Sequence, residues 1–301
     1  MAGENQERSY LIGHASVAAR PLEPALYPVS TPIGNLGDIT LRALETLAAA
    51  DIVAAEDTRV TRVLLDRYGI RRRVVAYHEH NEEEAGPRLI AALKEGRSVA
   101  LVSDAGTPLV SDPGYRLVAA ALEEGLRVVP IPGASAVLAA LTLSGLPSDT
   151  FLFAGFLPVK EGQRQARLES LGRVPATLIF FESPRRLAAS LAAMAGALGG
   201  ARPAAVTREL TKAFEERRAG TLEELAAHYA EAGAPKGEVV VCVGPPLAQA
   251  AEDMDIDRLL LSLAAEMPAS KAAAEAARMT GEQKPALYRR LIELKGRSGG
   301  G

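Results

Sequence analysis

The sequence contains almost no cysteine and no long apolar run. Cys242 is the only cysteine among 301 residues, so an internal disulfide is impossible and a cysteine-rich zinc site is not expected. No run approaches the ~18 apolar residues that a membrane helix needs. The segment 1–24 also lacks the apolar core of a secretory signal. We therefore expect a cytoplasmic protein that does not bind membranes.

Several common motifs are missing as well. The sequence has no GxxxxGK[ST] phosphate loop, no GxGxxG dinucleotide fingerprint and no GxSxG nucleophile turn. The formal net charge is −3 and the pI is about 5.9, whereas a nucleic-acid binder is more often basic overall. This charge argues against binding nucleic acid over the whole surface, but it leaves room for local basic patches.

Short apolar strands alternate with longer helical segments. Apolar residues make up 48% of the chain and charged residues 24%, which is enough apolar material for a core and excludes disorder of the whole chain. Strands of four to six residues followed by helices predict an α/β fold with a mostly parallel sheet. Glycine and proline fall where strands end, and ligands bind at that edge of such sheets.

A composition break near 146–150 divides this pattern into two consecutive α/β domains, as the length also suggests at ~150 residues per domain. Beyond them, an acidic linker (PPLAQAAEDMD) leads to an Ala-, Lys- and Arg-rich tail. Two short helices around a glycine in this tail resemble a helix-turn-helix, although a solvated hairpin that only packs on the body is equally compatible. The predicted parts are an irregular N-terminal extension (1–24), an N-terminal α/β domain (25–148), a C-terminal α/β domain (149–245) and a helical tail (256–297).

Polar loops follow several strands of the first domain. The segment SDAGTPLVSDPGY, after the apolar strand ending at Val102, is longer than the two to six residues that a strand-to-helix connection usually needs. TPIGNLGD, EDTR and IPGAS also end strands. Each turn taken alone can be a helix cap or a surface turn. Because such turns converge on one edge of one sheet, the set predicts a ligand site there.

Other charged clusters are open to two interpretations. FFESPRR and TREL place charged residues at strand ends of the second domain, where they can hold a ligand or form salt bridges between domains. The HEHN loop at 78–81 can be a surface loop or an RNA contact. It has no further histidine nearby in the sequence, so we expect no metal site.

The ordered segments LYPVSTPIGNLGDITLRAL, AEDTR, LVSDAGTPLVSDPGY, IPGASAV, FFESPRR and TREL resemble the tetrapyrrole methylase-like (class III) methyltransferases. Within that family they look like the subgroup that acts on small-subunit ribosomal RNA. The resemblance covers about 25–244, and the helical tail is similar too. The first 24 residues lie outside it. The acidic run Glu82–Glu84 after HEHN is atypical, because it would repel phosphates if it faced RNA.

The resemblance implies a tetrapyrrole methylase-like fold with S-adenosyl-L-methionine in a cleft between the two α/β domains, and a homodimer. It implies methylation of the ribose 2′-hydroxyl of a cytidine in the decoding region of small-subunit (16S) ribosomal RNA, as RNA or in the assembled small ribosomal subunit. The cofactor-binding residues that it implies are Pro32, Gly34, Asp104, Ala105, Gly106, Ser135, Ala136, Phe181, Arg208, Glu209, Glu238 and Val239.

This chemistry needs positioning and a proton acceptor. Methyl transfer from a sulfonium is an in-line displacement that depends on orientation. A ribose hydroxyl is a poor nucleophile, so a base should accept its proton. Asp57 and Glu182 are the candidate catalytic residues. Arginines can hold phosphate bidentately, and the candidate substrate-binding residues are Arg59, Arg185, Arg289 and Arg290.

Two alternatives remain open. A methyltransferase with the same fold can act on a tetrapyrrole or another small acceptor, but the basic tail favours RNA. A non-catalytic RNA-binding assembly protein can also keep this fold, but the intact cofactor loops argue against it. Binding of S-adenosylmethionine separates the second alternative from the other two.

Overall fold

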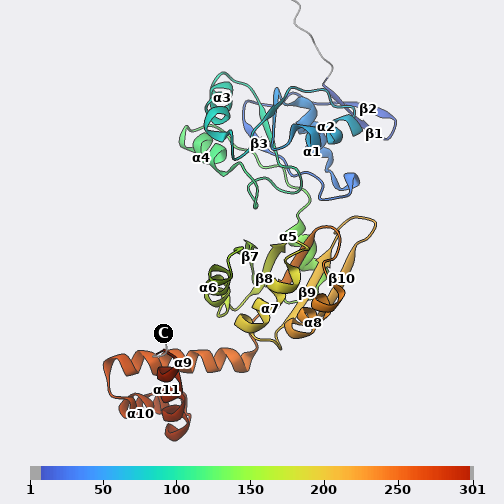
Figure 1. Ribbon diagram of the computed structural model, residues 1–301. Helices are drawn as coiled ribbons and strands as arrows, with labels where there is room; N and C mark the ends of the chain where they lie inside the picture. Colours follow the sequence, from blue (N-terminus) through green and yellow to red (C-terminus); the bar gives the residue numbers. More distant parts are fainter. Residues whose placement is uncertain (1–7, 299–301) are drawn as a thin grey trace, which may run out of the picture. The chain divides into compact units, whose positions relative to one another are not determined.

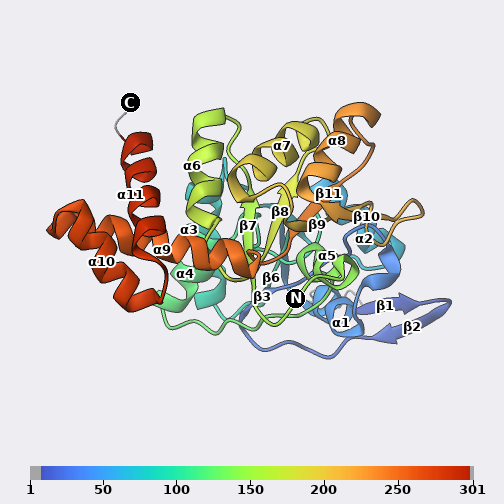
Figure 2. The same cartoon turned by 90° about the horizontal axis from the view of Figure 1, so that it is seen from below.

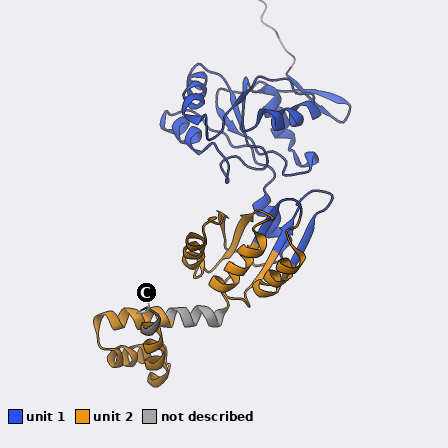
Figure 3. Ribbon diagram, in the orientation of Figure 1, with its two compact units in different colours: residues 1–145, 206–218, 236–241 blue, residues 146–205, 219–235, 242–301 orange. Residues whose placement is uncertain are grey.

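The computed structural model describes residues 8–298, with the backbone alone described at 248–255 and 296–298. The chain has an α/β fold and divides into two compact units (Figure 3). Unit 1 comprises the chain up to Gly145 together with 206–218 and 236–241. Unit 2 comprises 146–205, 219–235 and the chain from Cys242 onward. Each unit is described by itself below.

Unit 1 contains a four-stranded sheet in the order β3-β6-β4-β5, and all its strand pairs are parallel. The strands are β3 (Leu26–Pro28), β4 (Ile52–Ala55), β5 (Val74–Ala76) and β6 (Val99–Val102). The apolar runs IVAA and VALV are buried at every position, as expected of parallel strands covered on both faces. The segment ending at Ile131 runs beside β3 through isolated bridges at Val128 and Ile131.

Helices cover both faces of this sheet (Figure 1). They are α1 (Leu41–Ala49), α2 (Thr58–Arg67), α3 (Glu82–Lys94) and α4 (Tyr115–Glu123), with a short 3₁₀ helix η1 (Leu36–Asp38) before α1. Helix α5 (Ala136–Ser144) is assigned to unit 1 but contributes no residue to either of the two cores on this sheet. In β4, Val53 and Ala55 join one core with α1 and α2, while Ile52 and Ala54 join another with α3 and α4. Because successive side chains of the strand point to opposite faces of the sheet, the two faces pack against different helix layers.

A second sheet runs in the order β10-β9-β11-β8-β7. Its strands are β7 (Phe151–Phe156), β8 (Thr177–Glu182), β9 (Pro203–Arg208), β10 (Glu216–Thr221) and β11 (Val239–Val243). The helices between them are α6 (Glu161–Leu171), α7 (Leu187–Leu198) and α8 (Leu222–Ala232). A capping box begins α8, because the Thr221 hydroxyl accepts from the backbone N–H of Glu224 and the Glu224 carboxylate accepts from the backbone N–H of Thr221.

The extension expected to be irregular contains a hairpin instead. Strands β1 (Ser9–Ile12) and β2 (Ala15–Ala18) pair antiparallel around Gly13, whose φ is 62°. Tyr10 is the buried anchor and packs in the core beside α1. One buried residue in β1 and none in β2 are too few to give a recognisable period in the sequence.

The acidic segment expected to be a linker is also different, because helix α9 (Ala248–Glu266) runs through it. Helices α10 (Ala269–Thr280) and α11 (Lys284–Ser298) pack on α9 around Leu260, Leu287 and Leu291 (Figure 2). Gly281 ends α10 in the left-handed conformation, with φ 78°, as the sequence predicted. No helix in the described residues is both long and apolar enough to cross a membrane.

Candidate functional site

A cavity of about 350 Å³ lies at the carboxyl edge of the unit 1 sheet. Its walls come from the loop after β3, helix α2, the loop after β6, the turn after β9 and the residue that precedes β11. The lining residues are Thr31, Pro32, Ile33, Gly34, Leu36, Val60, Thr61, Val63, Leu64, Ser103, Asp104, Ala105, Lys212 and Glu238. Five of the residues proposed from the sequence to bind the cofactor are thus brought together, namely Pro32, Gly34, Asp104, Ala105 and Glu238.

The first two loops are fastened to each other. Thr31 N donates to Gly106 O at 2.8 Å, and Gly106 N donates back to Thr31 O at 3.1 Å. The hydroxyls of Ser30 and Thr107 lie 3.0 Å apart. Gly106 has a φ of 80°, a conformation that glycine adopts without strain. This double bridge fixes Pro32 and Gly34 opposite Asp104 and holds the mouth of the cavity open.

Carboxylates tie the ends of β4 and β6 together. Asp104 Oδ1 accepts from Asp57 N at 2.9 Å, and Glu56 Oε2 accepts from Asp104 N at 3.3 Å. Burial raises the pKa of Glu56, and the negative charge of Asp104 adds to this effect. Burial also raises the pKa of Asp112 to about 6, with a hydrogen bond from Ser103 acting against it and the charges of Glu56 and Asp104 reinforcing it. This edge of the sheet is therefore strongly acidic.

The opposite wall carries a lysine that the sequence analysis missed. Lys212 Nζ bridges the carboxylates of Glu209 at 2.7 Å and Glu238 at 2.9 Å. Burial lowers the pKa of Lys212, but its hydrogen bonds to both glutamates outweigh burial and raise it. The lysine stem crosses Gly34 so closely that a Cβ there would lie 2.6 Å from Lys212 Cγ. A side chain at position 34 would clash with the lysine stem, so glycine at this position allows Lys212 to line the cavity.

The two candidate catalytic carboxylates have different surroundings. Asp57 accepts from Arg59 N and thereby begins α2, and it pairs with the Arg59 guanidinium at 2.6 Å. The hydrogen bonds from Arg59 lower the pKa of Asp57 to about 2. Glu182 lies in unit 2 and is 3% exposed. Its carboxylate accepts from Ser183 N at 2.8 Å and from Ser190 Oγ at 2.5 Å, so both oxygens are already engaged.

The remaining residues proposed to bind the cofactor lie on several elements. Ser135 begins α5 by accepting from Leu138 N, and Ala136 is its first residue. Arg208 donates to Glu216 Oε2 at 2.8 Å and to Lys236 O. Val239 is buried in β11. Phe181, half-buried in β8, makes edge-to-face contacts with Phe153 and Phe156.

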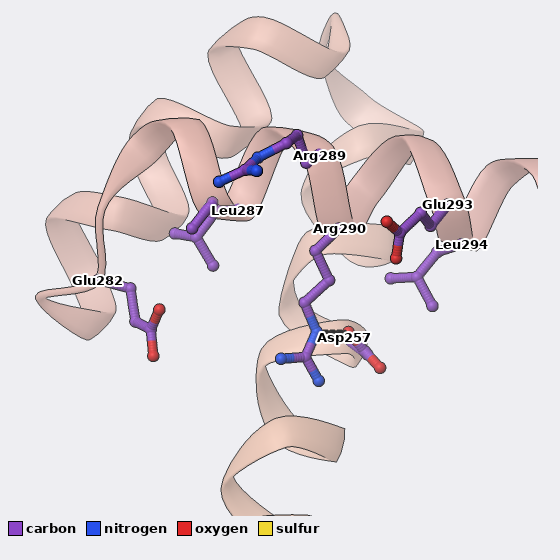
Figure 4. Close-up of a pocket in the computed structure, with 8 residues that line it drawn as sticks. Asp257, Glu282, Leu287, Arg289, Arg290, Glu293 and Leu294 are labelled. Atoms are coloured by element: carbon purple, nitrogen blue, oxygen red, sulfur yellow. Dashed lines mark hydrogen bonds and ion pairs between the residues drawn. The ribbon is translucent and has the colours of Figure 1, made fainter.

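The residues proposed to bind the substrate lie on exposed helices and loops. Arg59 is exposed on α2, and Arg185 is exposed in the loop after β8. Arg289 is exposed on α11, whereas Arg290 is directed toward Asp257 of α9 and forms an ion pair with it (Figure 4). Of these four arginines, Arg59 is the one whose helix lines the cavity.

Two family models match the chain. The model for Tetrapyrrole (Corrin/Porphyrin) Methylases matches residues 25–226, and the RsmI C-terminal HTH domain matches residues 250–295. The second match agrees with the helix-turn-helix expected in the tail, formed here by α10 and α11. The first covers every residue that lines the cavity except Glu238, and the second covers most of the helical module.

The chain is similar to curated proteins over nearly its whole length. It is 76% identical to "Ribosomal RNA small subunit methyltransferase I" of Mesorhizobium japonicum, over 97% of this chain and 99% of that protein. It is 49% identical to the protein of the same name from Escherichia coli O157:H7, over 90% of this chain and 96% of that one.

Among solved structures, a uroporphyrin-III C-methyltransferase from Thermus thermophilus, complexed with S-adenosyl homocysteine, shares the fold. The TM-score is 0.52 at 24% identity, over 73% of this chain and 97% of that one. The family match and the near-full-length relatives agree with each other. The chain therefore belongs to the tetrapyrrole methylase family, within the group of proteins named ribosomal RNA small subunit methyltransferase I.

Proposed function

We propose that the protein transfers a methyl group from S-adenosyl-L-methionine to small-subunit ribosomal RNA. The acceptor is the 2′-hydroxyl of a cytidine ribose in the decoding region. The observation that carries this proposal is the 76% identity, over nearly all of both chains, to a protein named for small-subunit ribosomal RNA. The cavity at the sheet edge and the helix-turn-helix module support it, because an RNA methyltransferase needs a cofactor pocket and RNA-binding surfaces.

The cavity has the chemistry to hold the cofactor. S-adenosyl-L-methionine carries a sulfonium and an ammonium against one carboxylate, so it is a net cation. Asp104 and Glu238 line the cavity, and Glu56 and Asp112 add negative charge near Asp104. Carboxylates attract a cation over these short distances. A solved structure of the same fold, cited above, was determined as a complex with S-adenosyl homocysteine.

The residues proposed to hold the cofactor act through backbone and charge. The main-chain groups of Gly106 are used in the bridge to Thr31, so Gly106 serves as the turn that holds Asp104 and Ala105 in the cavity wall. Asp104 and Glu238 line the cavity and would attract the positive groups of the cofactor. Ser135, Ala136, Phe181, Arg208, Glu209 and Val239 keep the cofactor-binding role that the resemblance gives them.

When bound, the cofactor supplies an electrophilic methyl group on sulfur. The carbon–sulfur bond breaks as the bond to the ribose oxygen forms, and the hydroxyl proton must leave to an acceptor. Asp57 is the first candidate acceptor, because it begins α2, whose residues line the cavity, and stays ionised, although Arg59 occupies both of its oxygens. Its low pKa suits a group that orients the hydroxyl and takes the proton late, as the oxygen becomes acidic. Glu182 is the second candidate, but Ser183 and Ser190 already use its oxygens.

RNA binding is proposed for the exposed arginines Arg59 and Arg185 and for the tail residues Arg289 and Arg290. Each arginine offers a planar set of donors that matches a phosphate. In the tail, Arg289 is the freer of the two, since Arg290 is held by Asp257.

We further propose that the protein acts in the cytoplasm as a homodimer.

Transfer of a labelled methyl group tests the proposal. The protein is incubated with labelled S-adenosylmethionine and either assembled small subunits or naked ribosomal RNA, and the modified nucleotide is located by mass spectrometry. We expect label on a cytidine ribose. If cofactor binding is intact but neither substrate is labelled, the acceptor is wrong and a small acceptor of the tetrapyrrole type becomes the next candidate.

The same assay tests the proton acceptor. Asp57→Ala should lower turnover by ~100-fold or more. Glu123→Ala, which removes an exposed carboxylate at the end of α4, is the matched control and should keep normal turnover. Normal turnover in a folded Asp57→Ala protein would remove Asp57 from the mechanism.

A further inference from the structure

Helix α2 is both a wall of the cavity and an exposed surface. Val60, Thr61, Val63 and Leu64 line the cavity, while Leu65 is buried in the core beside α1. At 3.6 residues per turn, the exposed residues of α2 fall within an arc of roughly 160°. They are Arg59, Val60, Arg62, Val63, Asp66 and Arg67. We call this arc the α2 rim (Figure 1).

The α2 rim is basic. It carries three arginines and one carboxylate, that of Asp66. Arg59 is paired with Asp57, and the Arg67 guanidinium lies over the Tyr68 ring at 5.7 Å. In the described part of the chain, no carboxylate pairs with Arg62. Arg62 and Arg67 can therefore donate to a phosphate without first losing an ion pair, whereas Arg59 is held by Asp57.

Exposed apolar side chains adjoin the arginines of the rim and also line the cavity. Val63 is 64% exposed and Val60 43%, and Leu36 across the mouth is 36% exposed. Single exposed apolar residues are normal on a protein surface. These three line one cavity, so they form a small apolar step on which a ribose or a base edge can pack.

The floor and the rim have opposite charge. Lys212 offsets the charge of Glu238 in the cavity wall. The remaining carboxylates, Asp104 with Glu56 and Asp112 nearby, repel phosphate groups. Three arginines stand on the adjoining rim. A polyanion that approaches this edge is therefore held at the rim, and only an uncharged part of it, such as a ribose hydroxyl, can enter without electrostatic cost.

From this division of charge we infer that the α2 rim is the surface on which the phosphate backbone of the RNA substrate docks beside the cavity. Arg62 and Arg67 hold phosphates, and Val60 and Val63 support the nucleotide whose ribose enters. The inference rests on the proposed RNA methylation and names the part of unit 1 that receives the RNA.

The test is charge reversal on the rim. Arg62→Glu with Arg67→Glu should weaken RNA binding at least about tenfold and raise KM for RNA. The dependence of the logarithm of affinity on the logarithm of salt concentration should become shallower by about 1 to 2, because ~0.7 is lost per phosphate contact to a single strand. Cofactor affinity should stay unchanged. The control is Arg88→Glu with Arg97→Glu, which reverses two exposed arginines on and just after α3, a helix that packs on the other face of the sheet.

The outcomes separate this inference from the proposed function. If the unaltered protein labels RNA and the rim variant keeps normal RNA affinity and salt dependence, the docking surface is wrong although the function stands. An equal loss in the α3 control would also overturn the inference, because it would show a general charge effect. No label from the unaltered protein overturns the proposed function itself. If the reversed pair does not fold, Arg62→Gln alone, checked by cofactor binding, is expected to weaken RNA binding by about half as much on a logarithmic scale.

Discussion

The carboxyl of Asp112 gives a quantitative test of the acidic edge. Burial, reinforced by the charges of Glu56 and Asp104, raises the pKa of Asp112 from 3.8 to about 6. A change of this size corresponds to a free-energy difference of about 3 kcal/mol between the two protonation states. Solvent screening of the partly exposed carboxyl reduces its effect on the free energy of unfolding to about 2 kcal/mol. The folded protein keeps this proton up to about pH 6, whereas the unfolded chain loses it near pH 4. The free energy of unfolding therefore falls as pH rises from about 4 to about 6. Above pH 6 the folded state carries the full free-energy cost of the ionised, buried Asp112 carboxylate.

Asp112→Asn removes that cost while keeping the shape of the side chain and an oxygen for the Ser103 hydroxyl. At pH 8 the variant should unfold about 4 to 8 °C above the unaltered protein, at ~2–4 °C per kcal/mol. At pH 4 the two should unfold within about 1 °C of each other. Scanning calorimetry across this pH range measures the difference. Asp66→Asn, which removes the same charge from an exposed helix face, should show no such pH dependence. A gain that is equal at every pH, or a loss at pH 8, would refute the reasoning.

Three further outcomes are expected. Lys212→Met leaves the carboxylates of Glu209 and Glu238 close together without their shared cation. The affinity for S-adenosylmethionine, measured by titration, should therefore change at least about threefold. An unchanged affinity would show that the lysine does not shape the cofactor site. Leu291→Ala removes a fully buried side chain from the tail core and should cost about 2 to 4 kcal/mol, seen as faster hydrogen exchange in the tail with the cavity loops unaffected. Truncation at Asp253 should weaken RNA binding and its salt dependence while sparing cofactor binding, and unchanged RNA affinity would exclude the tail as an RNA contact.

The sequence was most informative where local chemistry decides the structure. The apolar runs VALV and VVVCV became strands buried at every position. The capping box at Thr221 and the glycine at 281 set helix ends in the way these residue types favour. The N-terminal hairpin and the first turns of α9 were missed, because their sequences have no clear apolar period. In α9 the helical backbone includes four acidic residues at 252–257 together with the residues expected to be a linker.

The candidate site was predicted in part for the same reason. Strand ends in a parallel sheet must share one edge, so the loops after β3, β4 and β6 could be placed from the strand pattern alone. Asp112 lies in the loop that was singled out, yet its burial depends on how that loop folds back. Leu109 and Ser111 there have positive φ, at 75° and 64°, which no propensity of those residue types would predict.

Lys212 shows what sequence patterns cannot give. Glu209 and Thr211 on either side of Leu210 both have positive φ, at 51° and 65°, and such conformations cost about 1 to 3 kcal/mol each for residues other than glycine. They persist because Glu209 N donates to Glu238 O at 3.0 Å, and Thr211 N donates to Glu215 Oε2 at 2.7 Å. The turn formed in this way directs Lys212 across Gly34, 178 positions earlier in the chain. A strained turn and a distant glycine thus place one cation between two carboxylates, which lets the cavity wall hold its acidic groups close together without their mutual repulsion.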